Sequence, residues 1–531
     1  MKTALAHLIH DPEKLQGIIL ELQQQLAANE TALKQKESRI TQLEQNYQYL
    51  LEQFRLAQQR QFGKSSESAP DQLGLFNEAE QIQEEADKAG SEQETITCRR
   101  NKPKRKPLPK DLPRETVVHD IDEADKVCGC CGTDLHPMGE DKSEQLEFIP
   151  AQVRVIEHIR LKYSCRHCEQ NNTEVEIKTA PLPALPIPKS MATPSLLSQV
   201  ITSKYQYALP LYRQESLFKQ YGIELNRKTM SSWMMRCSQI LMPVYERLKT
   251  IQLQQKVINA DETPLNVINE DKTHCYMWVY CTGADSPAKD PPASHKQTPG
   301  IVLYEYQNSR AGACPKDYLQ GFDGYLQVDG YAGYEQTAAT LAGCFAHARR
   351  KFTEAKKAQV KGKSGKADMA LAMIQKLYRI ETEIRHRTAQ EKQPIRQEKS
   401  KPLLDQYKRW LDKSALQVPP KSALGKAIAY NLRQWTKLVR YIEDGHISID
   451  NNRAERAIKP FVIGRKNWLF SNTENGANAS AVLYSLVETA KANGLIPFDY
   501  LKYLFEELPK AAGDIDYLLP WNIVPENNGG I

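Results

Sequence analysis

The sequence predicts a multidomain α+β protein, and three observations support this fold class. The chain has 531 residues, which exceeds what one compact core usually holds, so several domains are expected. The N-terminal part has a heptad pattern of apolar residues, which is typical of a coiled-coil helix. Paired cysteines follow, and strand-like and helical segments then alternate over the C-terminal half.

The composition is that of a globular protein with some extended polar segments. Hydrophobic residues make up 40% and charged residues 26%, with a net charge of +6. No segment has the roughly 18 apolar residues of a membrane-spanning helix, and His7, His10 and Asp11 interrupt any apolar signal core. We therefore expect a cytoplasmic protein without a membrane partner, whose 11 cysteines are mostly buried thiols or metal ligands.

Residues 1–62 are predicted to form a coiled-coil oligomerisation helix. One heptad position is occupied by Ile19, Leu26, Leu33, Ile40, Tyr47 and Phe54. The other is occupied by Leu15, Leu22, Asn29, Lys36, Leu43 and Leu50. This pattern favours a homo-oligomer paired through the helix, and polar residues inside such a seam commonly fix its register. The alternative is a long amphipathic helix that packs on its own chain.

Residues 63–115 are predicted to be a linker, acidic in its first half and basic and proline-rich in its second. The basic residues are Arg99, Arg100, Lys102, Lys104, Arg105 and Lys106. Prolines between them prevent a regular helix, so they are expected to form an extended arm suited to DNA phosphates or a minor groove. The alternative is a solvated linker with incidental charge.

Residues 116–182 are predicted to be a zinc-ribbon domain. The ligands expected for structural Zn²⁺ are Cys128, Cys131, Cys165 and Cys168. Two C-x-x-C pairs can place four thiolates tetrahedrally around one ion, and the strand-like residues between them suit a hairpin. Nearby Cys130, His136 and His167 leave the ligand set open to revision. The alternative is a group of buried or unrelated thiols.

Residues 183–252 are predicted to be a helical, helix-turn-helix-like DNA-binding domain. One helix is expected to end at Gly222 and a second to begin at Asn226, which would place Arg227 and Lys228 in its first turn. The second helix of such a pair can enter a major groove. Helical hairpins with a glycine turn also occur in proteins that never touch DNA.

Five strand-like segments follow, at 256–263, 275–283, 300–306, 324–330 and 341–348. Asp261 lies near the end of the first, which Pro264 is expected to stop, and Asp329 lies at the end of the fourth. Glu455 is expected at the start of a later helix. Three such carboxylates could hold the divalent ions that phosphoryl transfer uses. The alternatives are aspartates that form turns and a glutamate that completes a capping box with Asn452.

A long helical region separates the strands from this glutamate. Residues 350 to about 443 read as helix. One apolar stripe is expected to comprise Ile428, Leu432, Trp435, Val439 and Ile442.

Several motifs in order resemble the insertion sequence 66 transposase family. They are QFGKSSE (61–67), ADET (260–263), QVDGYAGY (327–334), CFAHARRKF (344–352), DNNRAERAIKPFVIGRKNWLFSNTENGA (450–477) and LVETAKANGLIPFDYLKYLFEELP (486–509). The resemblance covers nearly the whole chain. It implies a ribonuclease-H-like core whose catalytic triad is Asp261, Asp329 and Glu455, with Mg²⁺ or Mn²⁺ as cofactor.

The resemblance also implies how the C-terminal half is divided. The core's first part would be 253–352, a helical insertion 353–444, the end of the core 445–480 and a C-terminal helical segment 481–531. Terminal inverted repeats would be the substrate, and accessory proteins of the same element would be further partners.

Cations surround the predicted acids, and a phosphate backbone would need them because carboxylates alone repel it. The residues expected to bind DNA here are His347, Arg349, Arg350, Arg456, Arg465 and Lys466. Ordinary surface charge is the alternative for most of them.

The sequence thus predicts a DNA transposase that binds terminal inverted repeats and performs metal-dependent strand cleavage and strand transfer on double-stranded DNA, at the nucleoid. The alternatives are a catalytically silent, zinc-containing DNA-binding protein and a nuclease that cuts without joining.

Overall fold

The computed structural model describes residues 12–62, 116, 152–164, 177–181, 185–270, 274–283, 299–358, 365–511 and 513–523. The chain forms two compact units. One unit comprises Met1–Glu92 and Tyr245–Ala492, and the other comprises Gln93–Val244 and Asn493–Ile531.

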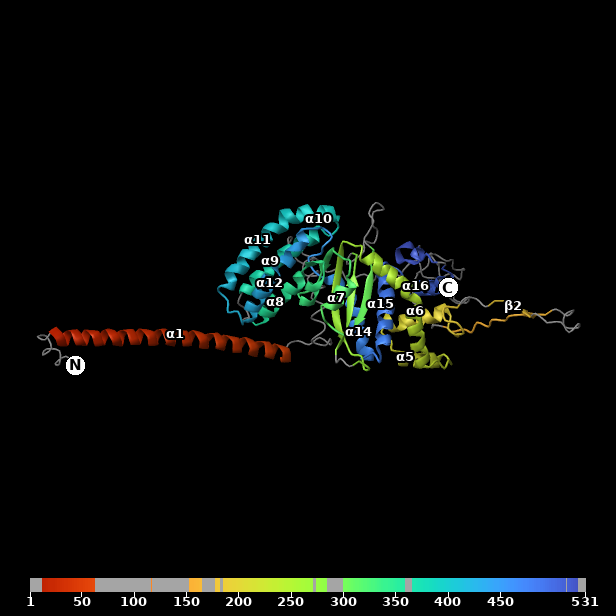
Figure 1. Cartoon of the computed structure of the whole chain (residues 1–531), viewed down its shortest axis with the longest axis horizontal. Helices are drawn as coiled ribbons and strands as arrows, with labels where there is room; N and C mark the ends of the chain where they lie inside the picture. The colour runs from red at the N-terminus through yellow and green to blue at the C-terminus, as the bar shows by residue number, and fades with distance from the viewer. Residues whose placement is uncertain are drawn as a thin grey trace, which may run out of the picture. The chain divides into compact units, whose positions relative to one another are not determined.

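The N-terminal segment is one continuous helix, α1 (Pro12–Phe62), drawn in red in Figure 1. The apolar residues of the predicted heptad seam are exposed along it. Leu22, Leu26, Leu33 and Leu50 have exposed fractions between 57% and 64%. The described part of the chain therefore leaves this apolar stripe uncovered.

A five-stranded sheet forms the centre of the first unit. Its strands are β3 (Val257–Leu265), β4 (Cys275–Cys281), β5 (Val302–Gln307), β6 (Tyr325–Gln327) and β7 (Thr340–Ala342), in the spatial order β5-β4-β3-β6-β7. β4 is antiparallel to both of its neighbours, while β6 is parallel to β3 and to β7. Strands β3, β5, β6 and β7 therefore run in one direction and end at the same edge.

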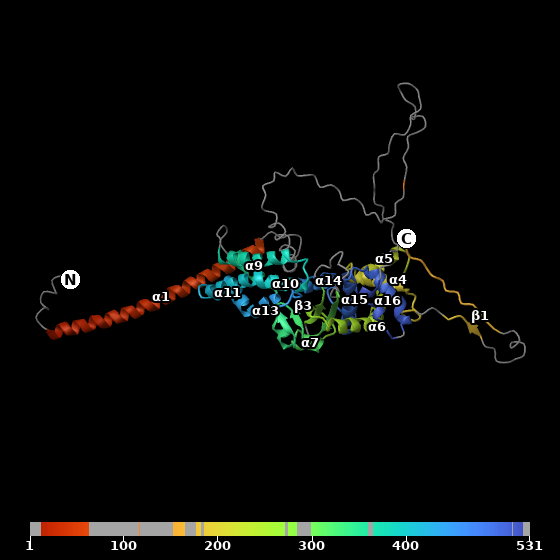
Figure 2. The same ribbon diagram turned by 90° about the horizontal axis from the view of Figure 1, so that it is seen from above.

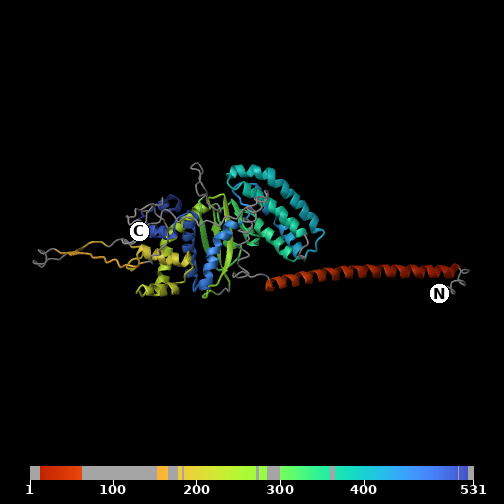
Figure 3. The same cartoon turned by 180° about the vertical axis from the view of Figure 1, so that it is seen from behind.

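Helices cover both faces of this sheet. On one face, Ile258 and Ala260 of β3 pack with residues of α7 (Ala313–Tyr318) and of the 3-10 turn η2 (Ala332–Gln336). On the other lie α14 (Asn452–Trp468) and α15 (Glu474–Ala492), the blue helices beside the green sheet in Figure 3.

Side-chain hydroxyls of α15 bind the backbone of β5. The backbone N–H of Val302 donates to Thr489 Oγ1 (3.0 Å), and that of Tyr304 donates to Ser485 Oγ (2.7 Å). These bonds satisfy backbone donors on the outer strand of the sheet, so α15 is an integral part of it.

Between β7 and α14 the chain forms a helical region with its own core (Figure 2). Its elements are α8 (Phe345–Lys357), α9 (Lys366–Glu383), α10 (Ala389–Ile395), the π-helical turn η3 (Arg396–Ser400), α11 (Lys401–Ala415), α12 (Ala423–Arg433), α13 (Trp435–Val439) and the 3-10 turn η4 (Arg440–Ile442). Phe352, Ile374, Tyr407 and Ile428 are buried in this core. Buried Arg396 pairs with Glu381 there (2.6 Å).

Three local predictions were wrong. The strand expected at 341–348 ends at Ala342, and Phe345 already begins α8. The stripe from Ile428 to Ile442 does not lie on one helix, because α12 ends at Arg433. Pro264 does not stop β3, which runs on to Leu265. Beyond Asn259, β3 has no partner on its β6 side, so a proline without an N–H is tolerated there.

The second unit is helical in its described part, apart from one short hairpin. Its elements are β1 (Lys162–Tyr163), β2 (Lys178–Thr179), α4 (Pro194–Tyr205), α5 (Leu211–Gln220), α6 (Arg227–Gln252, which continues into the first unit), α16 (Pro497–Glu507) and the 3-10 turns η5 (Leu508–Lys510), η6 (Asp516–Leu518) and η7 (Pro520–Asn522). α16 packs against α4. Among the described residues, no helix combines the length and the hydrophobicity that a membrane crossing requires.

Candidate active site

The two predicted aspartates lie near the ends of neighbouring strands, Asp261 on β3 and Asp329 just after β6. In the parallel pair β3–β6, Asn259 is opposite Gln327. Continuing this register by two residues brings Asp261 beside Asp329, which follows the end of β6. Neighbouring strands are about 4.8 Å apart, so both carboxylates occupy the same edge of the sheet. Each is held by a backbone N–H: Glu262 donates to Asp261 Oδ1 (2.9 Å) and Tyr331 donates to Asp329 Oδ1 (2.8 Å).

Glu455 lies on α14, the helix that packs against β3. It lies in the first turn of the helix and is only 3% exposed. The capping-box alternative is not realised, because Asn451 is the N-cap, Asn452 is already helical, and the cap makes no side-chain hydrogen bond.

A buried amide network fixes the start of α14 against the two strands. Asn259 Nδ2 donates to Asn451 Oδ1 (3.0 Å) and to Gln327 Oε1 (3.2 Å). Asn451 Nδ2 in turn donates to the carbonyl of Ala260 (2.9 Å). The network links both aspartate strands to the residue four positions before Glu455, so it fixes the start of the glutamate helix relative to those strands.

The three carboxylates repel one another. Burial raises the pKa of Asp261 well above its usual value, and the charges of Glu262, Asp329 and Glu455 raise it further. Among the described residues, neither Asp261 nor Asp329 forms an ion pair with a lysine, arginine or histidine side chain. Carboxylate oxygens without a cationic partner are the donors that Mg²⁺ and Mn²⁺ prefer, so the donor set fits a hard divalent cation.

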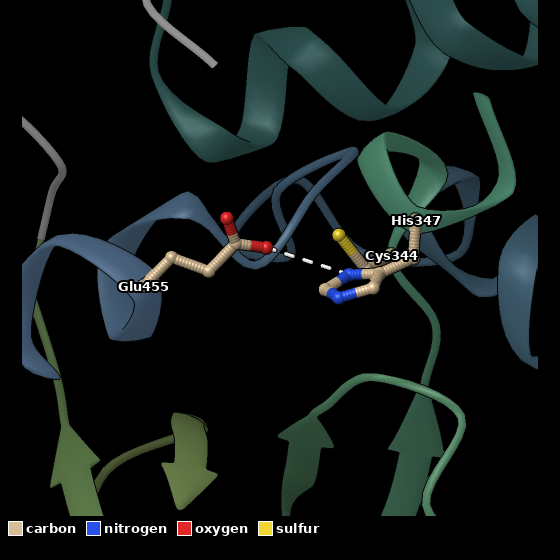
Figure 4. Close-up of side chains that lie close together, drawn as sticks. All are labelled: Cys344, His347 and Glu455. Atoms are coloured by element: carbon tan, nitrogen blue, oxygen red, sulfur yellow. Dashed lines mark ion pairs between the residues drawn. The ribbon is translucent and has the colours of Figure 1, made fainter. Parts of the chain in front are cut away.

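His347 of α8 faces Glu455 (Figure 4), and Arg350 of the same helix also lies near this carboxylate. His347 Nδ1 lies 3.4 Å from Glu455 Oε1, and Arg350 Nη2 lies 4.0 Å from Glu455 Oε2. Burial lowers the pKa of His347 to about 3, and the charges of Arg350 and Lys351 contribute. His347 is therefore neutral at pH 7, and Arg350 carries the positive charge beside Glu455.

Glu455 also belongs to a group of close metal-ligating side chains with Cys344 and His347, the one such group within the described residues. Atoms of Cys344, His347 and Glu455 that can bind a metal all lie within 4.8 Å of one another. The backbone N–H of Asn451 donates to Cys344 Sγ (3.1 Å), and that of Phe345 donates to the carbonyl of Ile449 (3.1 Å). These contacts tie the start of α8 to the segment that leads into the glutamate helix.

Glu262, directly after Asp261, is neutralised by its own surroundings. Its side chain is only 2% exposed. Arg310 donates to Glu262 Oε1 from Nε (2.9 Å) and Nη2 (2.5 Å), and Tyr334 Oη donates to Oε2 (2.6 Å). Burial raises the pKa of Glu262 and the charge of Asp329 adds to this, while Tyr334 and Arg310 oppose the rise.

The remaining predicted cations are more scattered. Arg349 is half-buried on α8 and Arg456 half-buried beside Glu455 on α14. Arg465 and Lys466 lie in the last turn of α14, about 15 Å along the helix from Glu455. The structure does not bring these last two to the carboxylates.

In the second unit, Arg227 and Lys228 are exposed in the first turn of α6. Lys228 also borders a surface hollow beside that helix, together with Lys189 and Arg236. Gly222, in the turn after α5, has φ +75°, which a glycine adopts without strain.

The zinc ligands and the basic arm cannot be placed. Cys128, Cys131, Cys165 and Cys168 lie outside the described residues, as does the range 99–106 that holds the arm. The described cysteines are all buried, and none forms a disulfide within the described residues, as expected for most of the cysteines; they are Cys237, Cys275, Cys281, Cys314 and Cys344.

Sequence reasoning missed the residues that support the acids. Strand alternation placed Asn259 on the same face as Asp261, which was a usable signal. Nothing in the local pattern pointed to Asn451 or Gln327 as its partners, because they are distant in sequence. Arg310 and Tyr334, the partners of Glu262, were missed for the same reason.

Four family models match successive parts of the chain. The family model described as "Transposase IS66 family" matches residues 189–479. The model "zinc-finger binding domain of transposase IS66" matches 125–169, "Transposase C of IS166 homeodomain" matches 49–117, and "IS66 C-terminal element" matches 485–521. The zinc-finger match spans all four predicted cysteine ligands.

Two similar proteins of Sinorhizobium fredii extend these matches over the chain. "Uncharacterized protein y4jD" is 36% identical over 431 residues, which cover 78% of this chain and 81% of that protein. "Uncharacterized protein y4qI" is 31% identical over 559 aligned positions, which cover both chains fully.

Proposed function

The chain belongs to the IS66 family of transposases, and from this membership we propose that it cuts and joins DNA at Asp261, Asp329 and Glu455. The observation that carries the proposal is the convergence of these acids. The parallel register of β3 and β6, continued by two residues, would bring the two aspartates together, and the charge of Glu455 acts on Asp261. We also propose a ribonuclease-H-like core, and the strand order with β4 as the antiparallel strand supports it.

The three carboxylates would hold Mg²⁺ or Mn²⁺. Bound divalent ions would neutralise the acids, withdraw charge from the phosphate oxygens and lower the pKa of water. The chain's own residues keep the acids in position. The Asn259–Asn451 pair holds the glutamate helix against β3, and Arg350 offsets the charge of Glu455.

The reaction has two phosphoryl displacements. In the first, water attacks the phosphodiester at the element's end, the P–O bond to the 3′ oxygen breaks, and a 3′ hydroxyl is released. In the second, that hydroxyl attacks a phosphodiester of the target DNA at the same carboxylates, the P–O bond to the target's 3′ oxygen breaks, and a 3′ hydroxyl is left on the target strand. No covalent protein intermediate is needed, so positioning and charge account for the catalysis.

The second unit would supply recognition of the element's ends. Exposed Arg227 and Lys228 at the start of α6, and the cations around the neighbouring hollow, suit a phosphate backbone. A zinc ribbon held by Cys128, Cys131, Cys165 and Cys168 and the basic arm at 99–106 would add contacts. Zinc content of the Cys128→Ser variant tests the ribbon, and an unchanged content would rule out these ligands.

Helix α1 would pair two copies of the chain. Its exposed stripe of leucines is the surface that a second identical helix would cover. Pairing suits the reaction, because two DNA ends must be processed together, at the nucleoid where the DNA lies. Sedimentation gives the oligomeric state of the wild-type full chain and of the variant Leu26→Lys/Leu33→Lys. Equal masses for the two proteins would refute pairing through α1.

The deciding experiment uses a duplex oligonucleotide that carries the inverted repeat flanking the gene. With Mg²⁺, the wild type is expected to nick this duplex and to join the cut end to a second duplex, while Asp261→Asn binds it but does neither. If both proteins bind without nicking, the protein is a catalytically silent DNA-binding protein. Nicking without a joined product indicates a simple nuclease.

A further inference from the structure

Arg310 lies at the same edge of the sheet as the catalytic aspartates. It follows β5, which runs parallel to β3 and β6, so all three chain segments leave the sheet together. Its side chain is 44% exposed, although the carboxylate that it binds is buried. The guanidinium is therefore held from one side and open to solvent on the other.

Two anchors fix this guanidinium. Its Nε and Nη2 both donate to Glu262 Oε1, at 2.9 and 2.5 Å. Its central carbon lies 4.0 Å from the centre of the Tyr331 ring, the distance of a cation–π contact. Tyr331 Oη also donates to the backbone carbonyl of Arg310. An arginine held this firmly loses little further freedom on binding a ligand.

Both anchors are directly connected to the aspartates. Glu262 follows Asp261 and its N–H binds that carboxylate, while the N–H of Tyr331 binds Asp329. A Cβ at Gly333 would lie 2.2 Å from the Tyr331 ring, so this glycine makes room for the ring on which Arg310 lies.

We propose that Arg310 binds a phosphodiester of the DNA strand that is cut. This inference rests on the proposed function and names one substrate contact of that site. Glu262 holds the cation in place, and Nη1, which donates no hydrogen bond within the described part of the chain, is left for a phosphate oxygen. An arginine beside a phosphate offers directed, charge-assisted hydrogen bonds, which suits a strand that must be aligned for attack. The competing explanation is that Arg310 only neutralises buried Glu262.

Salt dependence of binding tests the phosphate contact without requiring catalysis. The full chain is titrated with the inverted-repeat duplex, without divalent ions, at several salt concentrations. The slope of log K against log salt is negative, and the loss of one phosphate contact makes it less steep by about 0.9. For Arg310→Gln we expect this change in slope, and binding that is several-fold weaker at 0.15 M salt. For Arg310→Lys we expect the slope and the binding constant to stay near their wild-type values.

A matched control is Arg387→Gln, which also removes an exposed arginine from an arginine–glutamate pair (Arg387–Glu391, 3.4 Å), and it should leave the slope unchanged. In the nicking assay, Arg310→Gln should raise KM and leave kcat within about threefold.

Two outcomes overturn the proposal. The first is an unchanged salt slope for Arg310→Gln. The second is wild-type binding in the double variant Glu262→Gln/Arg310→Gln, because Arg310 would then serve only to neutralise Glu262. Failure of the proposed function is separate: the wild type would not nick DNA with Mg²⁺, whatever the salt slopes are.

Discussion

Two neighbouring acids of β3, Asp261 and Glu262, face opposite sides of the sheet and have opposite surroundings. Glu262 faces Arg310 and Tyr334, which neutralise and bind it. Asp261 faces two other carboxylates and no cationic partner within the described residues. The chain thus compensates the charge of Glu262 with its own residues, whereas the described residues offer Asp261 no cationic partner.

A third acid, Glu305 on β5, shows that a raised pKa is not confined to the candidate site. Burial raises its pKa to about 7, although Lys249 opposes the rise, and Glu305 Oε2 is buried with no hydrogen-bond partner. It is therefore poorly compensated too, and the charges of Asp317 and Glu246 also raise its pKa. The difference is that Lys249 offsets Glu305, whereas the charges of Glu262, Asp329 and Glu455 all raise the pKa of Asp261.

The largest expected effect separates Asp261 from Glu262 in catalysis. Asp261→Asn should slow single-turnover nicking of the inverted-repeat duplex by at least about a thousandfold, or about 4 kcal/mol. Glu262→Gln, which keeps the shape of its side chain, should slow it by no more than about tenfold. Equal losses in the two variants would mean that the contrast in their surroundings has no functional meaning.

The next effect concerns Glu305 and pH. Its pKa in the folded chain is raised above the unfolded value, so it stabilises the fold at low pH, and this stability is lost as the pH rises through about 7. Glu305→Gln should therefore raise the free energy of unfolding above that of the wild type by more at pH 8 than at pH 5. The difference between the two gains should be at most about 3 kcal/mol. Urea unfolding at both pH values measures this. A gain that does not depend on pH would contradict the prediction.

A divalent ion should stabilise only a chain with an intact carboxylate cluster. At a hundredfold excess over its Kd, Mg²⁺ should add about 2.7 kcal/mol to the stability of the wild type. Glu262→Gln should keep this gain, and Asp329→Asn should lose most of it. Thermal unfolding with and without Mg²⁺ provides the measurement, and an equal rise in Tm for both variants would place the ion elsewhere.

The smallest effect compares two buried tyrosine hydroxyls. Tyr334 donates to the carboxylate of Glu262, and Tyr318 donates to the neutral amide of Gln252 (2.8 Å). Tyr334→Phe should lower the free energy of unfolding by about 2 kcal/mol and Tyr318→Phe by about 1 kcal/mol, because a bond to a charged group is stronger. Denaturant titration gives both values. The reverse order would indicate that Glu262 does not depend on Tyr334.

The sequence was informative where the signal is local or carried by a family motif. The positions of Asp261 and Asp329 at the ends of two predicted strands indicated that they could share divalent ions, and the family motif around Glu455 supplied the third predicted acid. The end of the strand at Ala342 was missed because Cys344–Ala348 is apolar enough to read as strand. The partners of Glu262 were missed because Arg310 and Tyr334 are brought to it only by the packing of β5 and η2 around β3.

Glu455 lies far beyond the two aspartates in the chain, on the other side of the helical region α8–α13. A ribosome that adds about 5 to 20 residues per second needs roughly 10 to 40 s to pass from Asp261 to Glu455. A nascent or truncated chain that ends before α14 holds both aspartates and lacks the third acid. On the proposed function, incomplete translation products would therefore be unable to damage the chromosome, and cutting would begin only in chains synthesised past α14.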